Sequence, residues 1–198
     1  MIRALNYIVT GAGHTGTGYM AQLLRSAGIR CGHENVFRVD RVMEQGGEMF
    51  DADSSWAAAP FLDHPICTNA KILHVIRNPL NTLRSLVHGG TDGAADAWAG
   101  RLVGVNEDTA WEWQGRYYLE WNKLIEKNAV GTDYHLFKVE DRTKILDKLG
   151  LEQRVDWDIP TYNAHISNRR VPFTWDMVPD SLVKEELIEF ARENNYEA

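Results

Sequence analysis

The segment 11–18, GAGHTGTG, combines the glycines and hydroxyl residues with which a backbone can surround an anion. It follows a short apolar run and precedes a helical pattern, and backbone amides at such a helix start attract phosphate groups. Gly11 and Gly16 fit the first half of the nucleotide-binding pattern G-x-x-x-x-G-K-[ST]. Thr17 and Gly18 replace the lysine and the magnesium-binding hydroxyl of its second half. The segment therefore predicts a nest for an anion smaller than a metal-bound triphosphate.

Two other interpretations of the glycines remain open. The dinucleotide pattern G-x-G-x-x-G can be traced through Gly11, Gly13 and Gly16, although the stretch 36–40 offers only a poorly placed acid for a ribose. The segment can also be a tight strand-to-helix turn without a ligand. If the nest forms, its predicted binding residues are Gly13, His14, Thr15, Gly16, Thr17 and Gly18.

A second pair of polar residues, Arg77 and Ser85, follows the apolar run KILHVI. Arg-Asn-Pro ends this run, and proline in the first turn opens the next helix. Arg77 therefore stands at a strand end, and Ser85 lies two turns into the helix on the same side. Both can donate to one phosphate, the arginine with its charge and the serine with its hydroxyl. The alternative is a capped helix start with Ser85 on the surface.

The elements that must position these residues alternate between strand and helix. We predict strands at 5–10, 29–31, 71–76 and 134–139, and helices at 17–27, 36–43, 56–62, 79–87, 108–127 and 181–194, with a further short helix ending at Gly150. The glycine- and alanine-rich stretch 89–104 is predicted to be a loop. This alternation predicts an α/β fold with a central parallel sheet covered on both faces, and a ligand at the C-terminal strand ends.

Composition limits the class of protein. The chain has 198 residues, which predicts one domain spanning 1–198, and its 44% hydrophobic residues are ordinary for a globular protein. The net charge of −7 argues against nucleic-acid binding, which needs clustered Lys and Arg. No signal sequence and no run of 18 apolar residues is visible, so we predict a cytoplasmic protein with no membrane contact. Cys31 and Cys67 are expected to be free thiols.

Together, these motifs resemble those of the sulfotransferase family, whose members bind 3′-phosphoadenosine 5′-phosphosulfate (PAPS) on a P-loop-like fold. TGAGHTGTGY (10–19) is similar to the loop that holds the 5′-phosphosulfate, and VIRNPLNTLRSL (75–86) to the segment that holds the 3′-phosphate. GIRCGHENVF (28–37) resembles the segment with the catalytic glutamate of tyrosylprotein sulfotransferases, and FKVED (137–141) the family's acidic strand end. The resemblance implies a three-layer, sulfotransferase-type sandwich and PAPS as a co-substrate without a metal.

The resemblance also implies roles for individual residues. Glu34 would be the general base for an acceptor hydroxyl, with His33 as the alternative base. His14 stands where the family usually has Lys or Arg near the transferring group, so a donor role for it depends on its protonation. Arg169 and Arg170 would close over the nucleotide, or else form a solvated basic loop. For Glu34 the alternative is a solvated carboxylate at a helix start.

Two other functions share parts of this pattern. A P-loop kinase would need the lysine and hydroxyl that Thr17 and Gly18 replace. A non-catalytic binder of a 3′-phosphonucleotide would keep Arg77 and Ser85 without a use for Glu34. The acceptor of a sulfotransferase could be a sugar, a peptide tyrosine or a small metabolite with a hydroxyl. The aromatic residues of 111–121 are expected to pack in the core rather than to form an acceptor platform, and the seven histidines show no metal-ligand spacing.

Overall fold

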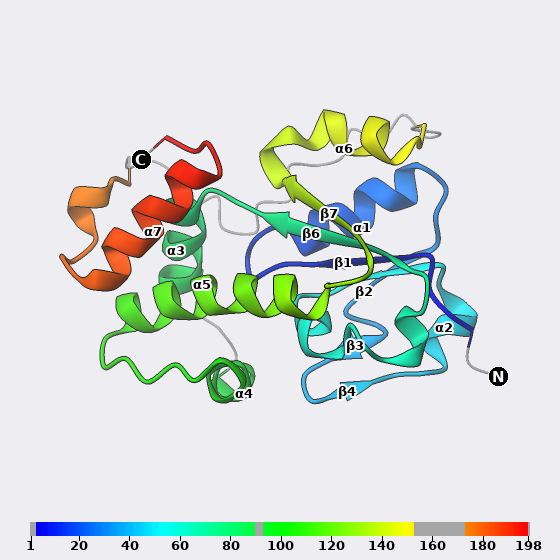
Figure 1. The fold of residues 1–198 in the computed structure, drawn as a ribbon, viewed down its shortest axis with the longest axis horizontal. Helices are drawn as coiled ribbons and strands as arrows, with labels where there is room; N and C mark the ends of the chain where they lie inside the picture. Colours follow the sequence, from blue (N-terminus) through cyan, green and yellow to red (C-terminus); the bar gives the residue numbers. More distant parts are fainter. Residues whose placement is uncertain (1–2, 90–92, 153–172, 198) are drawn as a thin grey trace.

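The fold is known from a computed structural model that describes residues 3–89, 93–152 and 173–197. Its centre is a sheet of five parallel strands in the order β2-β5-β1-β6-β7 (Figure 1). These strands are β1 (Tyr7–Thr10), β2 (Cys31–His33), β5 (Ala52–Ser54), β6 (Lys71–Ile76) and β7 (Asp133–Lys138). Because all pairs are parallel, the C-terminal ends of the five strands lie along one edge.

Helices follow the strands and cover the sheet. The α-helices are α1 (Thr17–Ser26), α2 (Gly46–Met49), α3 (Pro79–Gly89), α4 (Gly93–Val103), α5 (Ala110–Asn128), α6 (Arg142–Leu149) and α7 (Leu182–Glu193). A six-residue 3-10 helix spans Trp56–Phe61, and β3 (Phe37–Arg38) and β4 (Arg41–Val42) form a small antiparallel hairpin. The predicted parallel sheet with helices on both faces is confirmed.

One face of the sheet is covered by α1 and α6. Met20 and Leu24 of α1 and Ile145 of α6 are buried with Val9 and Leu73 of the sheet in one apolar cluster. The helical spacing of Met20 and Leu24 puts both on the side of α1 that faces the sheet. Burial of this stripe fixes α1, and with it the loop that precedes α1.

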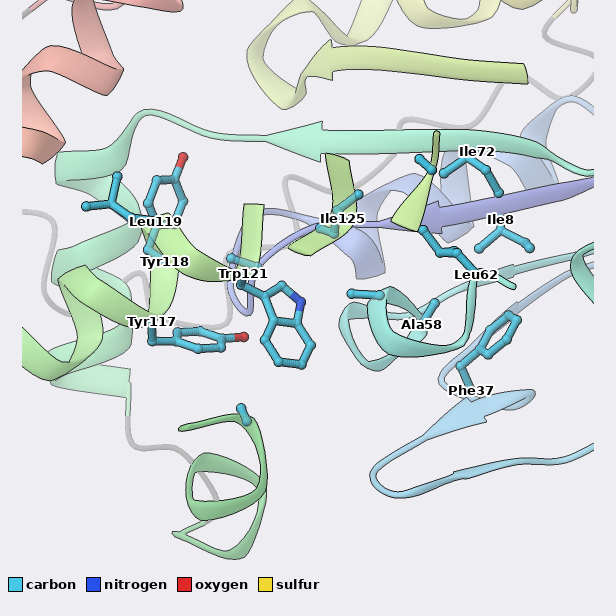
Figure 2. Close-up of a cluster of buried hydrophobic side chains, with 14 of the residues drawn as sticks. Ile8, Phe37, Ala58, Leu62, Ile72, Tyr117, Tyr118, Leu119, Trp121 and Ile125 are labelled. Atoms are coloured by element: carbon cyan, nitrogen blue, oxygen red, sulfur yellow. The ribbon is translucent and has the colours of Figure 1, made fainter. Parts of the chain in front are cut away.

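The opposite face is covered by α5 and the 3-10 helix. Trp121 and Ile125 of α5 lie in one cluster with Ile8, Ile72 and Ala58 (Figure 2). The indole of Trp121 is fully buried and donates to the Trp56 carbonyl oxygen at 3.1 Å. Since this cluster rests on β1 and β6, the first turns of α5 lie at the C-terminal edge of the sheet.

A buried histidine connects the middle of the sheet to both neighbouring elements. His74 of β6 is 0% exposed. Its Nδ1 lies 2.7 Å from the hydroxyl of Tyr134 on β7, and its Nε2 lies 2.8 Å from Oδ1 of Asn122 on α5. The Asn122 amide donates to the Tyr118 carbonyl oxygen, so Oδ1 is free to accept. The ring therefore carries its hydrogen on Nε2 and accepts at Nδ1 from Tyr134.

The prediction of a helix over 36–43 was wrong. This segment contains the β3–β4 hairpin, in which Phe37 pairs with Val42 and Arg38 with Arg41. Asp40 in the turn has φ 65°, a left-handed conformation that no helix interior allows. The spacing of Val36, Val39 and Met43 imitates a helical period, but the buried Phe37 is held by the sheet beside it.

Two other predictions need correction. The predicted loop 89–104 contains α4, because alanine is the best helix former and Trp98 gives α4 an aromatic ring that packs against Trp121. The second strand, predicted at 29–31, lies at Cys31–His33, and the sequence analysis predicts no strand at the position of β5. The other predicted strands and helices are confirmed with small shifts at their ends.

Candidate anion-binding site

The loop between β1 and α1 is compact because β6 lies directly beside it. A Cβ at Gly11 would overlap the Val75 carbonyl oxygen, so only glycine fits there. Thr15 is buried, and its hydroxyl donates to the Ala12 carbonyl oxygen at 2.7 Å, which uses its hydrogen inside the loop. His14 and Gly16 have φ 63° and 106°, both left-handed. The loop thus reverses the chain within a few residues and delivers it to α1.

Arg77 and Ser85, the two residues predicted after β6, both contact this loop. Arg77 Nη1 donates to the His14 carbonyl oxygen at 3.2 Å, and Ser85 Oγ lies 2.8 Å from His14 Nδ1. When Ser85 donates this bond, the hydrogen of the neutral ring is on Nε2. The structure thus brings a guanidinium, a hydroxyl and an imidazole together beside the glycine loop.

The backbone around Arg77 is held by two further side chains. The Tyr118 hydroxyl donates to the Arg77 carbonyl oxygen at 2.8 Å, and the Asn78 amide donates to Glu140 Oε1 at 3.0 Å. Glu140 also accepts from the Tyr196 hydroxyl at 3.0 Å. The acidic strand end FKVED therefore acts on the site through Asn78, a contact that its sequence position did not predict.

His33 is the last residue of β2 and Glu34 follows it, at the other end of the loop. An atom placed at the Cβ position of Gly18 would lie 3.4 Å from the His33 ring, so this ring rests against the first turn of α1. His33 Nε2 lies 3.7 Å from Glu34 Oε1, and the two side chains are 41% and 44% exposed. Both side chains are therefore partly exposed to solvent, and His33 lies against the start of α1.

The turn that carries Glu34 is held by β5. Asp53 is 0% exposed, and its carboxylate accepts from the Asn35 amide at 3.2 Å and the Phe37 amide at 3.1 Å. Burial raises the pKa of Asp53, and these backbone donors oppose the rise. Ser54 accepts from the Glu34 amide at 3.1 Å and donates from its hydroxyl to the Thr17 carbonyl oxygen at 2.7 Å. One strand thus fixes both the candidate base and the start of α1.

Tyr117 of α5 contacts the loop, although the sequence predicts only a core position for it. Its hydroxyl oxygen accepts from the Gly13 amide at 2.9 Å. The only signal in the sequence is the cluster of aromatic residues in 111–121, which is equally typical of a packed helix.

Two residues of the predicted site have no described position. Arg169 and Arg170 lie outside the described residues. In the described ranges, no three or more His, Cys, Asp or Glu side chains form a group that could hold a metal ion. None of the helices that the structure describes is long and apolar enough to span a membrane.

Two solved structures are similar to this chain over almost its whole length. A sulfotransferase from Alicyclobacillus acidocaldarius is 14% identical with a TM-score of 0.55, over 98% of this chain and 97% of that chain. The sulfotransferase domain from the curacin biosynthetic pathway is 12% identical with a TM-score of 0.55, over 98% of both chains. No protein-family model and no curated protein matches the chain. The chain therefore has a sulfotransferase-type α/β fold, as its motifs predicted.

Proposed function

We propose that this protein is a sulfotransferase that moves a sulfuryl group from PAPS to an acceptor hydroxyl. The observation that carries the proposal is the meeting of Arg77 and Ser85 at His14 of the glycine loop. Two segments separated by 63 residues thus meet at one loop. The site stands at the C-terminal edge of a parallel sheet, where ligands of such sheets bind.

The chemistry of these residues fits a donor with two anionic ends. The Gly13 and Thr15 amides bond to Tyr117 and to the Ala12 carbonyl oxygen, so other backbone amides of 13–18 at the start of α1 would hold the 5′-phosphosulfate. Arg77 with Ser85 would hold the 3′-phosphate. Thr17 and Gly18 offer neither the lysine nor the magnesium ligand of a P-loop kinase, so the proposed transfer depends on the chain's own donors.

The transfer itself asks for alignment and for charge stabilisation on the leaving phosphate. PAPS supplies the activated sulfuryl group when it is bound. His14 Nε2, oriented by Ser85 at Nδ1, would donate to the oxygen that leaves. Glu34 would accept the proton of the acceptor hydroxyl, with His33 as the alternative base. Any sugar, peptide or small molecule that presents a hydroxyl beside Glu34 would fit as the acceptor.

Thermal denaturation with two nucleotides tests the proposal. Adenosine 3′,5′-bisphosphate, which is the product of the donor, should raise the Tm without any metal because it binds the native state. At 100 times Kd the native state gains about 2.7 kcal/mol, or several degrees for a chain of this size. Stabilisation by ATP–Mg²⁺ but not by the bisphosphate would instead support the kinase. Transfer of radiolabelled sulfate to a panel of hydroxyl acceptors separates an enzyme from a non-catalytic binder.

The Arg77→Ala variant tests where the 3′-phosphate binds. We expect it to bind the bisphosphate about 30-fold or more weakly, the loss of one charge-assisted contact, while its affinity for adenosine 5′-phosphate hardly changes. Equal losses for both nucleotides would mean that Arg77 acts by holding the loop at His14. Lys71→Ala, which removes an exposed cation from the other end of β6, is the control for net charge.

A further inference from the structure

Tyr117 reaches the glycine loop from α5, and its hydroxyl is fixed there by packing. The residue is 4% exposed, and its oxygen accepts from the Gly13 amide at 2.9 Å. Its ring stacks on Trp113 at 5.7 Å between centroids and meets Trp121 at 5.4 Å. Figure 2 shows the ring extending from α5 beside Trp121. The hydroxyl thus has little freedom to leave the loop.

The phenol still has a hydrogen to donate. A phenolic oxygen can accept and donate at the same time, and the bond from Gly13 uses a lone pair only. Over residues 3–89, 93–152 and 173–197, no hydrogen bond takes up the hydrogen of Tyr117. Burial raises the pKa of Tyr117 far above its ordinary value, so the phenol is protonated at neutral pH. A buried donor without an acceptor is rare and calls for a ligand or another physical explanation.

The surroundings indicate which part of a ligand this hydrogen can reach. On one side the phenol contacts Gly13 of the loop. The negative charges of Asp96 and, to a smaller extent, Glu34 add to the rise that burial causes in the pKa of Tyr117. The phenol is therefore in contact with the loop proposed for the 5′-phosphosulfate, and it lies within the electrostatic reach of the carboxylate proposed for the acceptor. The group that passes between these two places is the sulfuryl group.

Building on the proposed function, we infer that Tyr117 is a further catalytic residue, whose hydroxyl donates to an oxygen of the transferring sulfuryl group. The Gly13 amide donates to the phenolic oxygen, and the phenol donates onward to the sulfuryl oxygen. Such a chain of hydrogen bonds polarises the middle donor and strengthens its bond to the anion. The phenol keeps its proton throughout, and only the hydrogen bond changes in strength as charge moves.

The Tyr117→Phe variant tests this assignment, because it deletes one buried oxygen. We expect kcat to fall by about 10²-fold, as for the loss of one donor to a developing oxyanion. The Kd for adenosine 3′,5′-bisphosphate should stay within about threefold, since this product has no sulfuryl group to contact Tyr117. The rate is measured as release of radiolabelled sulfate from PAPS to water, and to any acceptor that the panel identifies.

Each other outcome overturns a distinct claim. Wild-type protein that neither binds the bisphosphate nor turns over PAPS refutes the proposed function, and this assignment with it. An active wild type with a Tyr117→Phe variant of equal kcat shows that Tyr117 only packs. A variant that loses bisphosphate affinity as strongly as kcat shows that Tyr117 supports the loop and does not touch the sulfuryl group.

Two further variants keep the test decisive if Tyr117→Phe folds poorly. Replacing Tyr117 by p-aminophenylalanine keeps an acceptor for Gly13 and a hydrogen to donate, so kcat should recover to within about tenfold of wild type. A kcat as low as that of Tyr117→Phe would overturn the assignment. Tyr134→Phe is the matched control, because it removes a phenol that bonds to His74 inside the sheet, and its kcat should equal that of wild type.

Discussion

His14 receives two partners at once, Arg77 at its carbonyl oxygen and Ser85 at its ring. Ser85 has one hydrogen, so it cannot donate to both the neutral His14 ring and a 3′-phosphate. With a doubly protonated ring the direction reverses, because Nδ1 then donates to Ser85 and frees the hydroxyl hydrogen for the phosphate. Binding of the 3′-phosphate through Ser85 and protonation of His14 therefore favour each other in the proposed enzyme.

The choice between Glu34 and His33 as base can be made by mutation. Glu34→Gln keeps the shape of the side chain and removes the proton acceptor, so kcat should fall by about 10²–10⁴ while the Kd for the bisphosphate hardly changes. His33→Ala is the matched comparison, since His33 lies 3.7 Å from Glu34 with similar exposure. A large fall in His33→Ala with Glu34→Gln near wild type would assign the base to His33.

At the scale of single residues, the sequence predicted the positions of Arg77 and Ser85 better than the contacts between distant segments. The strand-end position of Arg77 and the two helical turns to Ser85 were enough to place both beside one loop. The bond from Gly13 to Tyr117 was not predictable, because it joins residues 104 positions apart. The hydrophobic periodicity of each segment predicts its own secondary structure but not a contact between the two segments.

At the scale of elements, β5 is the part of the site that local patterns missed. Ala52-Asp53-Ser54 has a single apolar residue, so nothing in its composition indicates a strand buried on both faces. Its polar side chains are satisfied by backbone groups of the neighbouring turn and of α1. Strand pairing with β1 and β2, which a single sequence does not reveal, is what orders it.

The Asp53→Asn variant tests how strongly β5 controls the turn at Glu34. The new amide group cannot accept from one of the two backbone donors, Asn35 or Phe37, which would then be buried without a partner. We expect a loss of about 1–3 kcal/mol in the free energy of unfolding, measured by urea denaturation. The exposed Asp63→Asn is the control, and should be neutral. If both variants unfold at the same urea concentration as wild type, the turn does not depend on Asp53.

At the scale of the whole molecule, His74 makes stability depend on pH. Burial lowers its pKa from 6.5 to about 4, and its hydrogen bond to Asn122 opposes this. Between pH 6.5 and 4 the unfolded chain binds a proton at His74 that the folded chain does not bind. The free energy of unfolding therefore has its full contribution from His74 above pH 6.5, and this contribution falls as the pH drops toward 4. The difference between the pKa values of His74 in the unfolded and the folded chain corresponds to a loss of roughly 3 kcal/mol in the free energy of unfolding.

Urea denaturation at several pH values checks this prediction. Wild type should lose stability from pH 6.5 to 4 more steeply than His74→Gln, which has no proton to bind at this position. The carboxylates of the chain contribute equally to both proteins, so the difference between the two slopes isolates His74. Identical slopes would mean that the protonated ring is accommodated in the folded state.

The strands that pair with β1 determine when the glycine loop can assemble during synthesis of the chain. β1 pairs with β5 and β6, which the ribosome makes later, and Gly11 rests against the carbonyl oxygen of Val75. A nascent chain that ends before β6 therefore contains the residues of the glycine loop but lacks the strand and the side chains that shape the site. Contacts this distant along the chain slow folding, because the intervening segment must first be closed into a loop. The shortest N-terminal fragment able to bring both Arg77 and Ser85 to His14 must extend beyond Ser85.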